Sequence, residues 1–493
     1  MSNLAILPLI IPAISGVIVA FTNSHVKTTR LLTKLFTLVG LAVTMFVAYT
    51  VFTDGAIILE TGGWIAPYGI ILVADKLSIL LVLTTNIIAT AAVFYAPNSL
   101  TLRQETHYFY TFYFMLIAGV TGAFLTGDLF NLFVFFEVLL MASYALIVLG
   151  GDKVQLRESI KYVLINLFSS MLFVTAIALL YGAVGTINMA QIAERVAEVE
   201  QTGILTTIAV LLFFVFGTKA ALFPLYYWLP RPYIVPNPVV SALFGALLTK
   251  VGIYSILRVF SLIFIHRMEI THEAFIWIAG LSMVFGVIGA LSTNNIKLII
   301  SYNIIPAIGF IIMGIGIFNL DALSGSIYYL VHDMIIKSAL FLLVGVIAYV
   351  AGTSDLKKMG GLIHHYPLLG WLLFIAAFIL AGIPPFSGFI GKLLLLRGAL
   401  SADEIAITLI ALLSSLLILY SVIKIFIRGF WGEKDETKTY TKKPSLGLIL
   451  PIVGLLAISV FLGIGAEFVY PSIEGIAEYL LDPQIYIDSV LKE

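Results

Sequence analysis

Charged side chains inside long apolar runs are the residues of this sequence whose chemistry stands out. Four lysines and one glutamate lie near the middle of such runs: Glu137, Lys219, Lys250, Lys337 and Lys392. A charge at the centre of a lipid bilayer costs about 2.5–3.5 kcal/mol on insertion scales, so it needs a cause. The usual causes are buried structural ion pairs and hydrated pathways for protons or ions. These five residues are therefore the candidate ion-translocating groups.

Two neighbours of Lys337 are further candidates for the pathway. Asp333 precedes Lys337 by four residues, which places both on one helix face, where a local ion pair would also explain them. His332 precedes Lys337 by five residues and faces roughly 140° away around a helix. A hydrogen-bonded interior histidine and a pathway residue both remain open for His332.

Prolines interrupt two of the apolar runs beside these lysines. Pro224 follows Lys219 by five residues, and Lys392 follows the pair Pro384 and Pro385. Proline removes a helix hydrogen bond and kinks or ends the helix. Broken helices at membrane depth occur only where protein or water satisfies the backbone, and transporters place binding sites there. The sequence therefore predicts two functional helix breaks.

The elements that position these residues are membrane-spanning helices. Apolar residues make up 61% of the 493 residues and charged residues 11%, against roughly half and a quarter in soluble domains. This composition excludes an ordinary soluble enzyme and a disordered chain. Lys+Arg and Asp+Glu are both 27, which argues against nucleic-acid binding. With no cysteine, disulfides, thiolate metal sites and cysteine-bound clusters are excluded, and we expect no cofactor and no metal centre.

About fourteen runs are long enough for the roughly 20 residues that cross a bilayer, so the predicted fold is an all-α polytopic membrane protein. The run at 367–400 would make a continuous helix of about 51 Å, which must tilt, break or extend beyond the membrane. The predicted runs lie near 3–21, 31–52, 76–96, 108–127, 128–150, 159–183, 203–229, 238–262, 273–292, 297–319, 322–350, 367–400, 404–430 and 446–467.

The order of the runs indicates two inverted five-helix repeats, in each of which the fourth helix is broken by proline. Inverted repeats place two half-channels around a central site. We therefore divide the chain into an N-terminal three-helix segment (1–107), a first repeat (108–262), a second repeat (263–430), and a C-terminal helix with an acidic external tail (431–493). The last 25 residues are expected to form a short surface helix.

Lysines and arginines of the connecting segments are distributed unequally. Sixteen, including Lys434 and Lys438, follow odd-numbered runs, and five lie on the other side: Lys76, Arg195, Arg267, Arg397 and Lys492. The positive-inside rule then places the first group in the cytoplasm and both termini outside. Arg258 and Lys424 lie near predicted helix ends and are expected to extend to the lipid headgroups.

Three segments together resemble a known family. KAALFPLYYWLPRPYIVPNPVVSALFGALLTKVGIY begins at Lys219, HDMIIKSALFLLVG at His332 and AGIPPFSGFIGK at Ala381. They resemble signatures of the antiporter-like subunits, which are the proton-translocating membrane subunits of respiratory complex I and of Mrp cation/proton antiporters. The resemblance covers roughly 70–430. The length of the chain is similar to that of the D-type subunits of the Mrp antiporters.

The resemblance implies a chain of protonatable groups at mid-depth. Glu137 and Lys219 correspond to the coupled pair of the first half-channel, Lys250 and Lys337 to the central axis, and Lys392 to the end of the second half-channel. Two departures stand out. The loop LPRPYIVPNP lacks the histidine common in complex I members, and His332 aligns one residue away from the family's histidine.

The function implied by the resemblance is that of an ion-translocating subunit of a multi-subunit Na+/H+ antiporter in a bacterial plasma membrane. Its partners would be the other Mrp subunits and the lipid bilayer, and H+ and Na+ would be the transported ions. A proton-pumping subunit of complex I or of a membrane-bound hydrogenase is the alternative. A non-transporting scaffold is the third interpretation. No cluster of oxygen ligands in the sequence marks a Na+ site.

Overall fold

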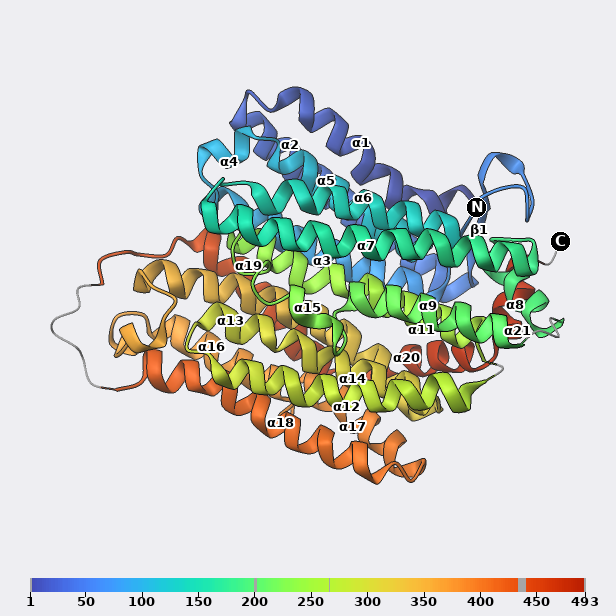
Figure 1. Cartoon of the computed structure of the whole chain (residues 1–493). Helices are drawn as coiled ribbons and strands as arrows, with labels where there is room; N and C mark the ends of the chain where they lie inside the picture. The colour runs from blue at the N-terminus through green and yellow to red at the C-terminus, as the bar shows by residue number, and fades with distance from the viewer. Residues whose placement is uncertain (1, 199–201, 266, 433–439, 492–493) are drawn as a thin grey trace.

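The computed structural model describes residues 2–198, 202–265, 267–432 and 440–491. In these ranges the regular structure is helical apart from one small β-hairpin, and the first and last described residues lie at the same end of the bundle (Figure 1). The α-helices are α1 (Leu7–Thr22), α2 (Val26–Asp54), α3 (Lys76–Ser99), α4 (Leu102–Thr106), α5 (Phe109–Leu125), α6 (Leu129–Val148), α7 (Lys153–Val184), α8 (Met189–Glu198), α9 (Thr202–Ala220), α10 (Pro238–Leu243), α11 (Thr249–Leu262), α12 (Met268–Ser292), α13 (Ile296–Tyr302), α14 (Ile304–Ile317), α15 (Leu320–Ala351), α16 (Pro367–Ala381), α17 (Ser387–Ser401), α18 (Ile405–Ile425), α19 (Leu446–Ile464), α20 (Ala466–Leu481) and α21 (Pro483–Leu491).

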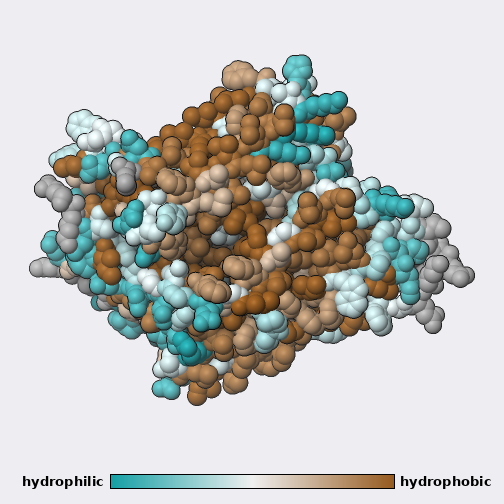
Figure 2. All heavy atoms as spheres, turned by 180° about the vertical axis from the view of Figure 1, so that it is seen from behind, coloured by the Kyte–Doolittle hydropathy of each residue, from teal (hydrophilic) through white to brown (hydrophobic). Residues whose placement is uncertain are grey.

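The helices confirm an all-α polytopic membrane protein. Within the described residues, 12 helical segments are long and apolar enough to cross a membrane, and two shorter apolar helices, α5 and α16, accompany them. Apolar side chains cover much of the rear face of the molecule, and hydrophilic ones gather mainly toward its margins (Figure 2). The count of fourteen spans and the two inverted repeats remain predictions.

Several spans are interrupted, two of them at the predicted prolines. Helix α9 ends at Ala220, and after Pro224 the chain continues as a short 3-10 helix, Leu225–Trp228. The predicted run 367–400 is two helices, α16 and α17, joined by residues 382–386. A π-helical turn, Phe244–Leu248, separates α10 from α11, and Asn303 separates α13 from α14.

The centre of the bundle is formed by α11 and α15. Helix α15 is buried along almost its whole length because α14, α17, α19 and α20 pack around it. Helix α11 is buried on every side. The hairpin of β1 (Ile57–Glu60) and β2 (Ile71–Ala74) leads into α3, whose first turn is capped by Asp75. These two enclosed helices carry Lys250, Asp333 and Lys337, the charged residues of the centre.

The C-terminal segment differs from the short surface helix that we predicted. It forms two helices, α20 and α21, which pack against α15, α11 and α8. Apolar residues such as Ile473, Ile476 and Tyr486 are buried in this contact, so hydrophobic burial docks the segment onto the bundle. Lys434, Lys438 and Lys492, which entered the count of loop charges, lie outside the described residues.

The prediction that Arg258 and Lys424 extend to the headgroups is wrong. Arg258 is 3% exposed and forms an ion pair with Asp75, between the rings of Tyr254 and Tyr486. Lys424 is 7% exposed and donates to two backbone carbonyls at the end of α12, at 2.7 and 3.1 Å. Because oxygen partners are available inside the protein, neither side chain needs a headgroup.

Candidate ion-translocation site

The first cluster joins Glu137 and Lys219 through a serine. Ser170 on α7 donates its hydroxyl hydrogen to the carboxylate of Glu137 on α6. The ammonium of Lys219 on α9 donates to the same hydroxyl oxygen at 3.2 Å. Within the described part of the chain, Glu137 forms no direct ion pair within 4 Å. The predicted pair is therefore brought together, with Ser170 between its two members.

The break after α9 fixes the position of Lys219. Lys219 lies in the last turn of α9, is 4% exposed, and its ammonium sits 5.0 Å from the centre of the Phe136 ring. The indole nitrogen of Trp228, beyond the break, donates to the carbonyl of Thr218 at 3.0 Å. The interrupted backbone thus regains a hydrogen bond, and the ring face stabilises the ammonium.

The central cluster places one carboxylate between two lysines. Asp333 on α15 lies 2.7 Å from the ammonium of Lys250 on α11 and 3.5 Å from that of Lys337, one turn along its own helix. All three side chains are fully buried. Asp333 therefore does more than form the local helix pair that the spacing suggested, because it also links α15 to α11.

Three lysines contact carbonyl groups where helices are interrupted. Lys250 donates to Gly245 in the π-helical turn at 2.8 Å. Lys337 donates to Asn303 at the α13–α14 junction at 2.9 Å, and Lys392 to Ala381 at the end of α16 at 2.8 Å. Carbonyls at helix ends lack intrahelical partners and carry partial negative charge. Each of these ammonium groups therefore has a backbone oxygen as a hydrogen-bond partner.

The third cluster surrounds the second helix break. Lys392 on α17 lies 4.8 Å from the centre of the Phe310 ring, and both His332 and Lys392 are buried. One ring nitrogen of His332 is 2.8 Å from the hydroxyl of Ser387, which follows Pro384 and Pro385 directly after Phe386. The other nitrogen has no hydrogen-bond partner among the described residues. The structure thus places His332 beside the second break.

Sequence reasoning missed the polar residues that connect these clusters. Ser170 is 33 positions from Glu137, and a serine in an apolar run carries no signal that distinguishes it from its neighbour Ser169. Ser387 lies in the predicted break, but its contact with His332 could not be inferred from spacing. In the described ranges, no group of three His, Cys, Asp or Glu side chains is placed to hold a metal ion.

Fold and site together define a class: polytopic membrane proteins in which buried lysines lie beside interrupted helices. Residues 126–418 match the family described as NADH:quinone oxidoreductase/Mrp antiporter, transmembrane. The chain belongs to this family.

Similar proteins extend this likeness to the whole chain. The chain is 49% identical over 493 residues to the D-type subunit of the Na(+)/H(+) antiporter of Bacillus subtilis (strain 168), covering 100% of both. It is also 49% identical over 494 residues to the protein of the same name in Alkalihalophilus pseudofirmus, again covering 100% of both. Among solved structures, a chain of the Mrp complex from Dietzia sp. DQ12-45-1b aligns over 100% of both chains, with a TM-score of 0.92 and 28% identity. The resemblance to D-type Mrp subunits is thereby confirmed.

Proposed function

We propose that this chain is an ion-translocating membrane subunit of a multi-subunit Na+/H+ antiporter. It moves protons along Glu137, Lys219, Lys250, Lys337 and Lys392 in exchange for cytoplasmic Na+. The observation that carries this proposal is the set of buried charged clusters beside helix breaks. Relatives named as D-type subunits of Na+/H+ antiporters, similar over their full length, support the complex and the ions.

Changes in the contacts of the lysines provide the mechanism. A carboxylate that moves toward or away from a buried ammonium changes how firmly the lysine holds its proton. Ser170 supports such a step at the first cluster, because its hydroxyl bonds to both Glu137 and Lys219. At the centre, Asp333 can strengthen its contact with one lysine at the expense of the other. Protons would then pass between clusters through intervening water.

The two alternatives make different demands on the same complex. A subunit of complex I or of a membrane-bound hydrogenase would couple proton movement to a redox partner, and the family includes redox-driven complexes as well as antiporters. A scaffold would not need its central charges at all. The antiporter and the redox-driven pump therefore differ in what drives proton movement.

Transport by the whole complex tests the proposal. We expect a pH gradient imposed across vesicles that contain the complex to collapse when Na+ is added. K+ at the same ionic strength is the control for a nonspecific salt effect. A gradient that responds to a respiratory substrate and not to Na+ would favour the redox-driven pump.

A conservative change at Ser170 should reduce exchange without removing the charges. In Ser170→Ala the hydroxyl between Glu137 and Lys219 is lost. We therefore expect the rate of Na+-dependent exchange to fall about tenfold or more, which is less than the full contribution of a positioned proton-transfer group. Ser170→Thr keeps the hydroxyl and should keep most of the exchange. Initial rates of pH change in vesicles with equal amounts of complex measure the effect.

The neighbouring serine supplies the matched control. Ser169 is also buried on α7, and its hydroxyl donates to the carbonyl of Val215 at 3.2 Å. Ser169→Ala should therefore leave exchange close to the wild-type rate. Equal rates for Ser170→Ala and Ser169→Ala would contradict a role for the serine bridge.

We also propose that the chain lies in a bacterial plasma membrane, with both termini outside. Cysteine labelling tests the orientation, because the native chain has no cysteine. We expect a membrane-impermeant thiol reagent to label Asn3→Cys and Glu478→Cys in intact cells and to label Lys358→Cys only after the membrane is opened. All three positions are exposed in the structure. The reverse labelling pattern would invert the orientation.

A further inference from the structure

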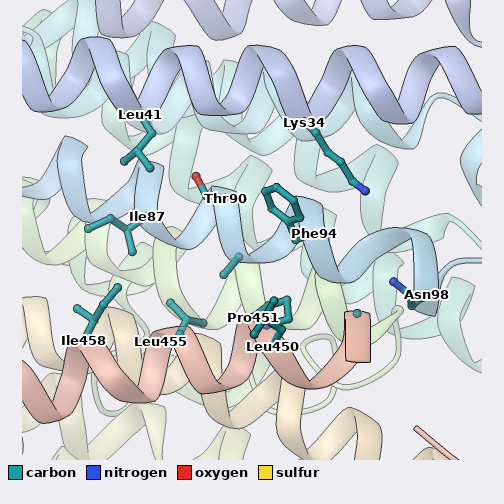
Figure 3. A pocket seen from close by; sticks show the side chains of 13 residues that line it. Lys34, Leu41, Ile87, Thr90, Phe94, Asn98, Leu450, Pro451, Leu455 and Ile458 are labelled. Carbon is teal, nitrogen blue, oxygen red and sulfur yellow. The ribbon is translucent and has the colours of Figure 1, made fainter. Parts of the chain in front are cut away.

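An apolar groove lies between α2, α3 and α19, away from the charged clusters. Its volume is about 480 Å³, and Figure 3 shows side chains of these helices lining it. The apolar walls include Leu41, Ile87, Phe94, Leu455 and Ile458. This composition suits a hydrocarbon chain.

One end of the groove is polar. Lys34 lies there, with its ammonium 5.3 Å from the centre of the Phe94 ring, and Asn98 lies at the same end (Figure 3). No carboxylate of the described residues comes within 4 Å of this ammonium. The groove thus combines an apolar channel with an uncompensated positive charge at one end.

The length of the groove matches one leaflet of a bilayer. Along α3 it extends from Ile87 to Asn98, and along α19 from Gly447 to Ile458. Each stretch spans about 16 Å at roughly 1.5 Å per residue. Half of a hydrocarbon core that is about 30 Å thick is about 15 Å. With Lys34 at the headgroup level, a groove of this length reaches about the middle of the membrane.

We propose that this groove binds one anionic phospholipid of the leaflet that faces Lys34. The phosphate pairs with the Lys34 ammonium, and an acyl chain lies against the apolar walls. A membrane-spanning helix of a partner would need a contact surface through both leaflets, whereas the groove covers one. In the orientation proposed above, this leaflet is the cytoplasmic one. The lipid site does not depend on the antiport function.

Gly454 provides a way to close the groove without disturbing the backbone. It lines the groove, and a Cβ added there would meet no atom within 4 Å. Gly447 differs, because a Cβ there would lie 2.2 Å from the side chain of Asn98. Gly454→Leu should therefore fill the groove while α19 keeps its contact with α3.

Retained lipid can be counted by mass spectrometry after the whole complex is purified from vesicles of equal phosphatidylglycerol and phosphatidylcholine. We expect wild-type complex to retain at least one more phosphatidylglycerol than the Gly454→Leu complex. Lys34→Gln should lower the preference for phosphatidylglycerol over phosphatidylcholine about fivefold, as expected for one lysine near an anionic surface. Lys27→Gln, an exposed position on α2 outside the groove, is the matched control and should keep the preference.

Two results would overturn the proposal. Equal retention of phosphatidylglycerol by wild type, Gly454→Leu and Lys34→Gln would mean that no such lipid is bound. Loss of a partner subunit from the Gly454→Leu complex, with an unchanged lipid count, would assign the groove to a protein contact.

Discussion

Na+-driven proton exchange should be abolished when Asp333 is replaced by asparagine. The change keeps the size of the side chain and removes the only carboxylate within 4 Å of Lys250 and Lys337 in the described residues. Removing one partner of a buried ion pair costs about 3–5 kcal/mol, because the remaining charge is left uncompensated. Without the Asp333 carboxylate, Lys250 and Lys337 can no longer alternate in pairing with it. Exchange rates in vesicles, at matched levels of assembled complex, measure the loss.

Two variants separate charge from side-chain structure at this position. Asp333→Glu keeps the carboxylate and should retain part of the activity. Asp321→Asn makes the same substitution on the same helix. Asp321 forms an ion pair with Arg397, and the Arg397 side chain is 57% exposed. Because exposed pairs contribute little, this control should assemble and exchange like wild type. Wild-type exchange by Asp333→Asn would remove Asp333 from the mechanism.

Lys219→Ala should also abolish exchange while the complex still assembles. The ammonium bonds to Ser170 at the first helix break, and alanine cannot hold or release a proton. We expect less than about a tenth of the wild-type rate, within the range for losing a positioned proton-transfer group. Lys424→Ala is the matched control, since Lys424 is also buried but, among the described residues, donates to backbone carbonyls alone. Its effect should be milder.

A double substitution distinguishes a proton relay from a structural pair. Glu137→Gln with Lys219→Met removes both charges together, and a purely structural pair tolerates such a replacement. If the pair is a relay, this double variant should assemble but should not exchange. Recovered exchange would show that the charges serve structure alone. Glu137→Asp, which keeps the acid on a shorter side chain, should retain partial activity.

The sequence allowed the charged residues and the helix breaks to be predicted, because each depends on local pattern. A lysine in an apolar run and a proline within a helix are visible without knowledge of the fold. The contacts between helices were not visible in this way. Lys250 and Asp333 are 83 positions apart, and the packing of α10 and the π-helical turn Phe244–Leu248 against α15, not their spacing, brings them together.

Arg258 illustrates the limit of local reasoning. Near the end of a predicted span, its long side chain fits an interaction with headgroups. Its actual partner, Asp75, is 183 positions away, at the start of α3. The two helices meet only in the folded chain, so hydropathy gave no indication of the pair. The same applies to α20 and α21, whose burial depends on the surface that α15 and α11 offer.

Helix α21 covers the ion pair of Asp75 and Arg258, and this arrangement has a consequence for biosynthesis. Asp75 and Arg258 leave the ribosome long before Tyr486, whose ring lies 5.0 Å from the guanidinium in the finished protein. Until α21 is made, the pair lacks one wall of its enclosure. A nascent or prematurely terminated polypeptide would therefore present a water-accessible charged pair beside its membrane segments.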